Sequence, residues 1–140
     1  MGRILAIDYG QKRVGLAVTD ELRMIAGALA SIQTKDVIAY LKDYIAHEKV
    51  DCFVVGYPLT LKNQLSESGR FTEPFVKHLQ KTFPNIAVER MDERFTSKMA
   101  TAAILESGAR KKVRQDKALV DKVSAVIILQ SYLEMMIMQR

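Results

Sequence analysis

The sequence predicts an α/β fold, a mixed five-stranded sheet flanked by helices. Near the start of the chain, three short segments with strand patterns follow one another, separated by turns too short for a crossover. This order predicts an antiparallel meander. Two more apolar segments then alternate with segments of helical periodicity, which is typical of parallel strands joined by crossovers. The strands are expected at residues 4–7, 14–18, 25–32, 52–56 and 86–91.

Amphipathic helices are expected between and after the later strands. In the first of them, Val37, Leu41 and Ile45 recur at helical spacing. The last is strongly apolar and begins with a face of small side chains. The helices are expected at residues 36–49, 71–83, 97–107 and about 118–138, with a polar loop at residues 60–69.

Length and composition indicate one domain spanning residues 1–140. The chain is 49% apolar and 26% charged, and we find no internal repeat, linker or domain boundary. No apolar run approaches the roughly 20 residues of a membrane span, and no signal peptide is expected. The single cysteine, Cys52, lies in an apolar run and is expected to be a buried structural thiol, which fits a reducing cytoplasm.

The charge balance and the residue types narrow the function classes. A net charge of +5 with a pI near 9.4 favours a polyanionic partner such as nucleic acid. Two histidines and one cysteine argue against a zinc site. The sequence shows neither a Ser–His or Cys–His arrangement nor a glycine-rich phosphate loop, so acidic residues become the candidates for chemistry.

Acidic residues stand at the ends or on the inner faces of three expected core elements. Asp8 ends the first strand and shares a face with Ile4 and Ala6, where an unpaired buried charge would be costly. The alternative is an aspartate that only initiates the turn. The pair Asp92–Glu93 follows the fifth strand, and Asp121 heads the inward face of the last helix. Carboxylates from separate elements are suited to Mg²⁺, and two such ions can catalyse phosphodiester cleavage.

Four stretches of the chain resemble one family. They read IDYGQKRVGLAVTD (7–20), VGYPL (55–59), DERFTS (92–97) and DKVSAVIILQ (121–130). In these stretches the chain resembles the YqgF family of pre-16S rRNA nuclease and Holliday-junction-resolvase-like proteins, in the ribonuclease H superfamily. The stretches occur in the family's order and cover nearly the whole chain, so the resemblance implies a ribonuclease H-like fold. Two departures are the absence of glycine at residues 60–63 and Ser124 in place of a usual alanine.

The resemblance also implies the site residues. The catalytic acids are expected to be Asp8, Asp92, Glu93 and Asp121. The metal ligands are expected to be Asp8, Glu93 and Asp121, with Asp92 as the alternative to Glu93. The ions are expected to be Mg²⁺ or Mn²⁺, two of them when substrate is bound. Substrate phosphates are expected on Lys12, Arg13 and Arg94, and on the basic run at Arg110, Lys111 and Lys112, which could otherwise be a solvated loop.

Three functions remain open at the level of the sequence. The leading one is a metal-dependent nuclease that hydrolyses RNA, matures the 5′ end of pre-16S rRNA and leaves a 5′-phosphate. The second is a junction-resolving DNase, which normally requires a symmetric dimer. The third is a non-catalytic nucleic-acid or ribosome-binding factor. The expected partners are pre-rRNA or structured DNA and the small-subunit precursor, in the cytoplasm, with no membrane and with a monomer or weak homodimer.

Overall fold

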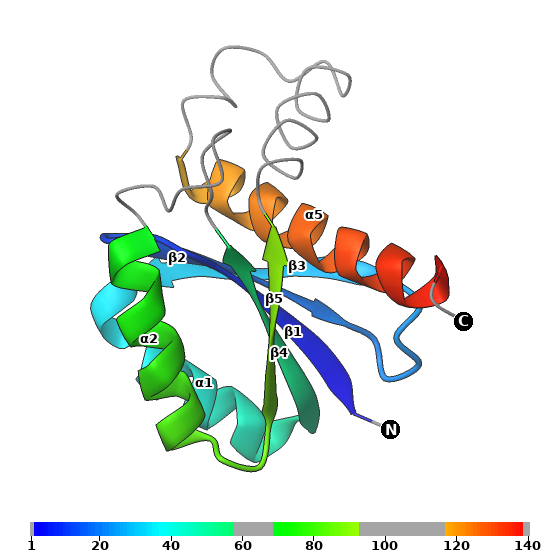
Figure 1. The fold of residues 1–140 in the computed structure, drawn as a ribbon, viewed down its shortest axis with the longest axis horizontal. Coiled ribbons are helices and arrows are strands. Elements are labelled where there is room, and N and C mark those ends of the chain that lie inside the picture. The colour runs from blue at the N-terminus through cyan, green and yellow to red at the C-terminus, as the bar shows by residue number, and fades with distance from the viewer. Residues whose placement is uncertain (1, 58–68, 93–116, 139–140) are drawn as a thin grey trace.

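The computed structural model describes residues 2–57, 69–92 and 117–138, which form a mixed five-stranded sheet with helices on both faces (Figure 1). The strand order is β3-β2-β1-β4-β5, and β1 is antiparallel to β2 but parallel to β4. The predicted mixed sheet and meander are therefore confirmed. The elements are β1 (Arg3–Tyr9), β2 (Arg13–Thr19), β3 (Ala26–Gln33), the short helix η1 (Thr34–Asp36), α1 (Val37–His47), β4 (Val50–Tyr57), α2 (Gly69–Thr82), β5 (Ala87–Asp92) and α5 (Lys117–Met138).

The element bounds differ from the predicted ones by one or two residues in most places. Helix α1 ends at His47 rather than residue 49, because the backbone of Glu48 is already extended. Strand β4 consequently begins at Val50, where it pairs with Arg3 of β1. The expected helix at residues 97–107 lies outside the described residues, as do nearly all of the loop at 60–69 and all but the last residue of the basic run at 110–117.

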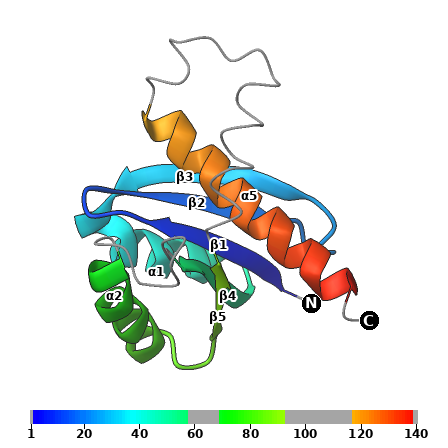
Figure 2. The same ribbon diagram turned by 45° about the horizontal axis from the view of Figure 1, so that its top comes forward.

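The two faces of the sheet carry separate cores. Figures 1 and 2 show α1 and α2 on one face and α5 on the other. Leu5 and Ile7 of β1 pack with the α1 and α2 face, whereas Ile4 and Ala6 pack with α5. The alternation predicted for the first strand is therefore confirmed, and it places position 8 on the α5 face.

Helix α5 lies against small side chains of the sheet. Ala125 of the helix and Ala6 and Ala17 of the sheet belong to one cluster and are fully buried. Ile128 and Tyr132 extend the same buried face, as the spacing from position 121 predicts. Small residues on both sides allow the helix axis to approach the sheet closely. No helix within the described ranges is both long enough and apolar enough to cross a lipid bilayer.

The single cysteine is less buried than predicted. Cys52 is half-buried on the α5 face, where it packs beside that core. Burial raises the pKa of the Cys52 thiol to about 11, so the thiolate is scarce at neutral pH. A structural thiol rather than a nucleophile remains the interpretation of Cys52.

Candidate functional site

The candidate site lies at the edge of the sheet where the parallel strands end. Strands β1, β4 and β5 run in the same direction, so their carboxyl ends meet at one edge (Figure 1). Helix α5 runs in the opposite sense to β1, because its C-terminus lies close to the start of β1 in both views (Figures 1 and 2). The first turns of α5 consequently lie towards the carboxyl end of β1.

Asp8 is the second-last residue of β1 and is half-buried. It pairs with Gly15 of β2, and continuing the register from Ile7 and Val55 by one residue pairs it with Gly56 of β4. Both glycines are buried and carry no side chain, and neighbouring strands are only about 4.8 Å apart. Asp8 is therefore the one residue with a side chain in this row across the three strands.

The neighbouring residue, Tyr9, packs on the opposite face of the sheet. Its ring stacks on Phe75 of α2, with centroids 4.4 Å apart. Burial raises the pKa of the Tyr9 hydroxyl, so it stays protonated through neutral pH. This contact fixes the end of β1 against α2.

The other predicted acids fall on elements that reach the same region. Asp92 is the last residue of β5, paired with Tyr57 of β4. Asp121 lies in α5, four residues before the buried Ala125. The side chains of Asp92 and Asp121, and the whole of Glu93, are outside the described part of the chain.

The basic residues predicted to bind substrate are described only in part. Lys12 lies in the turn after β1 and is exposed, and Arg13 begins β2 and is half-buried. Both follow Asp8 within five residues, as expected for a group beside the site. The other four basic candidates, Arg94, Arg110, Lys111 and Lys112, are not in the described ranges.

The donor chemistry at Asp8 is that of a hard divalent cation. Its oxygens are the ligand type that Mg²⁺ and Mn²⁺ prefer. Among the described side chains, no three carboxylate, imidazole or thiol groups gather to hold a metal ion. The further ligands expected from the sequence belong to positions whose side chains are not described.

Sequence reasoning missed an ion pair that joins β5 to α2. Arg90 donates two hydrogen bonds to the carboxylate of Glu73, at 2.8 and 3.1 Å. These bonds hold the pKa of Glu73 below its usual value, so the carboxylate is ionised across the physiological range. The two residues are 17 positions apart, and only the crossover between α2 and β5 brings them together, so no local pattern could show the pair.

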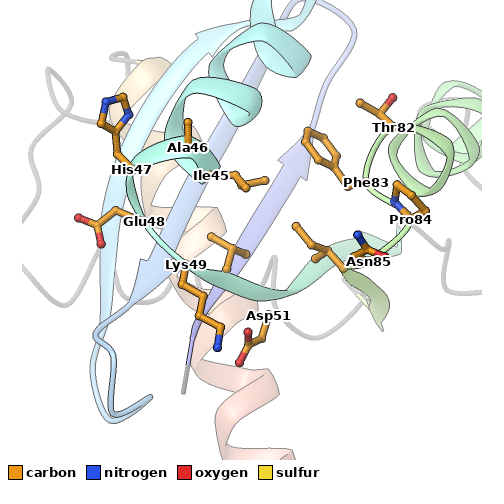
Figure 3. A pocket seen from close by; sticks show the side chains of 12 residues that line it. Ile45, Ala46, His47, Glu48, Lys49, Asp51, Thr82, Phe83, Pro84 and Asn85 are labelled. Atoms are coloured by element: carbon orange, nitrogen blue, oxygen red, sulfur yellow. The ribbon is translucent and has the colours of Figure 1, made fainter.

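A pocket at the opposite end of the sheet has a lining of mixed charge. At the far end from Asp8, a pocket of about 560 Å³ lies between the end of α1 and the turn before β5 (Figure 3). It carries the basic groups His47 and Lys49 beside the acids Glu48 and Asp51. Asp51 accepts a hydrogen bond from Arg23 at 2.8 Å. This mixed and internally neutralised surface is unsuited to a polyanion.

The fold is similar to that of RuvC-type resolvases. The chain superposes on RuvC of Thermus thermophilus in complex with a Holliday junction substrate with a TM-score of 0.60, at 15% identity over 96% of both chains. It superposes on a fowlpox virus resolvase bound to Holliday junction DNA with a TM-score of 0.52, at 15% identity over 94% of this chain and 99% of that one. At such identities the likeness shows the fold alone, and it confirms the predicted ribonuclease H-like class.

Comparison of sequences identifies the family, which the likeness in fold does not. Residues 2–135 match the model of the RuvX family, described as Holliday junction resolvase. A protein of Parabacteroides distasonis is 56% identical over 134 residues, 96% of each chain, and one of Porphyromonas gingivalis is 54% identical over 134 residues, 96% of this chain and 97% of that protein. Both carry the provisional name pre-16S rRNA nuclease. The chain belongs to the RuvX (YqgF) family, as the sequence motifs predict.

Proposed function

We propose that this protein is a metal-dependent nuclease that hydrolyses phosphodiester bonds of RNA and matures the 5′ end of pre-16S rRNA. The observation that carries the proposal is Asp8, held at the carboxyl end of the central strand between two buried glycines. The provisional names of relatives at about 50% identity support the substrate. The proposed activity belongs to residues 1–140 acting as one domain, in the cytoplasm.

Strand alternation favours Glu93 over Asp92 as the second acid. Met91 packs with the α5 core, whereas Arg90 reaches Glu73 on the α2 side. Ile4 and Ala6 pack with the α5 core, so strand alternation assigns Asp8 to the same face. Counting by twos from Met91, the same alternation would assign position 93 to that face. We therefore infer that Glu93 joins Asp8, and that Asp92 has a supporting role.

The position of α5 along the strand direction of the sheet favours Asp121 as the third acid. Ala6 and Ala125 belong to the same core cluster. Asp8 lies two residues beyond Ala6, about 7 Å along the strand. Asp121 lies four residues before Ala125, about 6 Å along the helix. Because α5 runs opposite to β1 (Figure 1), these two steps go in the same direction. We therefore infer that the two acids lie near one level along the sheet.

The proposed division of chemistry follows from these placements. Asp8, Glu93 and Asp121 would hold Mg²⁺ or Mn²⁺, which when bound supplies Lewis-acid stabilisation of charge on the phosphodiester. The chain's own task is to fix the three carboxylates on rigid elements. Arg94 would bind a phosphate beside the scissile bond, and Lys12 would bind the substrate strand further along and so align it.

A second candidate function is resolution of four-way DNA junctions. The family description and the likeness to RuvC, which is bound to a Holliday junction in the structure compared, favour it. Paired symmetric cuts would require a homodimer. The two candidates are separated by substrate and by oligomeric state in solution.

The test is cleavage of an end-labelled precursor rRNA fragment, with a four-way DNA junction in parallel. Wild type is assayed with Mg²⁺, Mn²⁺ or EDTA beside Asp8→Asn and the control Asp43→Asn, an exposed aspartate of α1. We expect metal-dependent RNA cleavage that Asp8→Asn lowers by about 10³-fold or more, since the lost stabilisation is several kcal/mol. Asp43→Asn should keep the wild-type rate.

The other outcomes are equally informative. Cleavage of the junction alone, by a dimer, would replace the RNA substrate with DNA. Equal cleavage by wild type and Asp8→Asn would refute the site. Tight RNA binding without cleavage under any metal would make the protein a binding factor.

A further inference from the structure

A second pocket, of about 490 Å³, lies beside the turn that follows β1. Two segments build it, the β1–β2 turn with the start of β2 and the junction between β3 and η1. The described residues that line it include three basic and three neutral polar side chains and no acidic one: Gln11, Lys12, Arg13, Gln33, Thr34 and Lys35. Lys12 and Arg13 are predicted from the sequence to bind phosphates, whereas the β3–η1 segment carries no such signal.

Hydrogen bonds fix the two walls of this pocket against each other. The backbone N–H of Thr34 donates to the carbonyl of Lys12 at 3.0 Å, and the Thr34 hydroxyl donates to the carbonyl of Gly10 at 2.7 Å. Arg13 pairs with Gln33 in the β2–β3 ladder. The basic side chains are therefore gathered before any ligand arrives, which lowers the entropic cost of binding.

The charge of this pocket distinguishes it from the pocket at the other end of the sheet. There, Glu48 and Asp51 neutralise the neighbouring basic groups (Figure 3). Here, Lys12 and Lys35 are exposed, and the nearest acid in the sequence, Asp36, is not part of the lining. Among the described lining residues, Lys12 and Lys35 carry like charges, and an anion between them would relieve their repulsion. The chemistry of the lining is that of a phosphate site.

The pocket also lies at a useful distance from the proposed catalytic acid. The row that joins Arg13 to Gln33 is two residues along β2 from Gly15, the partner of Asp8. That step is about 7 Å, and each strand crossed adds about 4.8 Å sideways. The separation from Asp8 is therefore about 8–12 Å.

We propose that this pocket binds a backbone phosphate of the substrate strand away from the scissile bond, with Lys35 as its main contact from the β3–η1 side. The proposal rests on the proposed function for the location of the scissile bond, but binding itself is measured without cleavage. Such a contact positions the strand and carries no sequence preference.

The experiment measures the salt dependence of RNA affinity in EDTA, where no cleavage is expected. Lys35→Gln and Lys12→Gln are compared with wild type and with Lys49→Gln, an exposed lysine of the opposite pocket. Loss of one phosphate contact should lower the slope of log K against log salt by about 0.7 for a single strand. Between 1 M and 0.1 M salt this slope difference is about fivefold in affinity. Lys49→Gln should match wild type.

Cleavage by the same variants separates this proposal from the proposed function. Lys35→Gln should raise KM with kcat unchanged, because the contact is made equally in the ground and transition states. An unchanged salt slope in Lys35→Gln and Lys12→Gln, with wild-type cleavage intact, would overturn the phosphate pocket alone. A lowered slope with no cleavage by wild type under any metal would keep the pocket and overturn the nuclease. A third outcome is that millimolar inorganic phosphate competes with RNA for the wild-type protein while Lys35→Gln binds RNA as tightly as wild type does. This outcome would assign the pocket to a free anion and refute the proposal.

Discussion

Substitution of Ala125 by leucine tests whether the packing of α5 on the sheet positions a catalytic acid. Ala125 is fully buried in a cluster with Ala6 and Ala17, so there is no room for a larger side chain. Leucine reaches about 2.5 Å further than alanine, the length of two carbon–carbon bonds. Overpacking of this kind costs about 1–3 kcal/mol, and the helix can relieve it only by moving away from the sheet. Asp121, one turn earlier, would move with it.

The expected result is a large loss of rate in a protein that still folds. A displacement of about 1 Å at a catalytic group can cost about 10²-fold, so kcat for RNA cleavage should fall at least that far in Ala125→Leu. Gln130→Leu, at an exposed position of the same helix, is the matched control and should keep both stability and rate. Rates are compared at a temperature where denaturation curves show all proteins folded. A wild-type kcat in Ala125→Leu, together with lowered stability, would refute the claim that α5 positions a catalytic acid.

Two further predictions concern groups outside the site. The Glu73–Arg90 pair should show a coupling energy of about 1 kcal/mol at neutral pH in a double-mutant cycle of Glu73→Gln and Arg90→Met, a value reduced because Glu73 is partly exposed. Folding lowers the pKa of Glu73, so this stability is fully present above the unfolded pKa of 4.5 and is lost as the pH falls through the folded pKa. Equal coupling energies at neutral and strongly acidic pH would contradict the assignment. Cys52 should react with a thiol reagent at least about 100-fold more slowly in the native protein than in denaturant. The reason is that raising the pKa of its thiol from 9.0 to about 11 lowers the thiolate fraction by that factor. Comparable rates in the two states would show an accessible thiol.

The fold was largely predictable because its pattern is local. Alternation in β1 separates Ile4 and Ala6 from Leu5 and Ile7, and the structure places these pairs in the two different cores. The inward face of α5 follows from helical periodicity alone, and Ala125 and Ile128 are buried as expected. Element ends were less predictable, because the end of α1 at His47 depends on where β4 must begin to pair with β1.

The candidate site was predictable only where its residues are close in sequence or match a family motif. Asp8 and Lys12 lie together in one hairpin, so strand alternation and turn signals were sufficient to single them out. Lys35 has no such signal, since it sits in a polar stretch before a helix and resembles an ordinary solvated lysine. It reaches the site only because β3 pairs with β2 and because Thr34 bonds to the turn after β1.

The two glycines beside Asp8 illustrate how sheet register carries functional information that a linear motif does not. Gly15 lies seven residues from Asp8, and Gly56 lies in a different strand. Each could be explained by itself as a small residue in a buried strand, where glycine is unfavourable. Strand pairing places both glycines beside Asp8 on the face that α5 covers. This position explains why glycine is present there although it lowers the stability of a strand. The same row explains why the carboxylate is only half-buried although the strand that bears it is the centre of the sheet. If an ion binds beside Asp8, a methyl group at either position should weaken metal-dependent cleavage more than it weakens RNA binding.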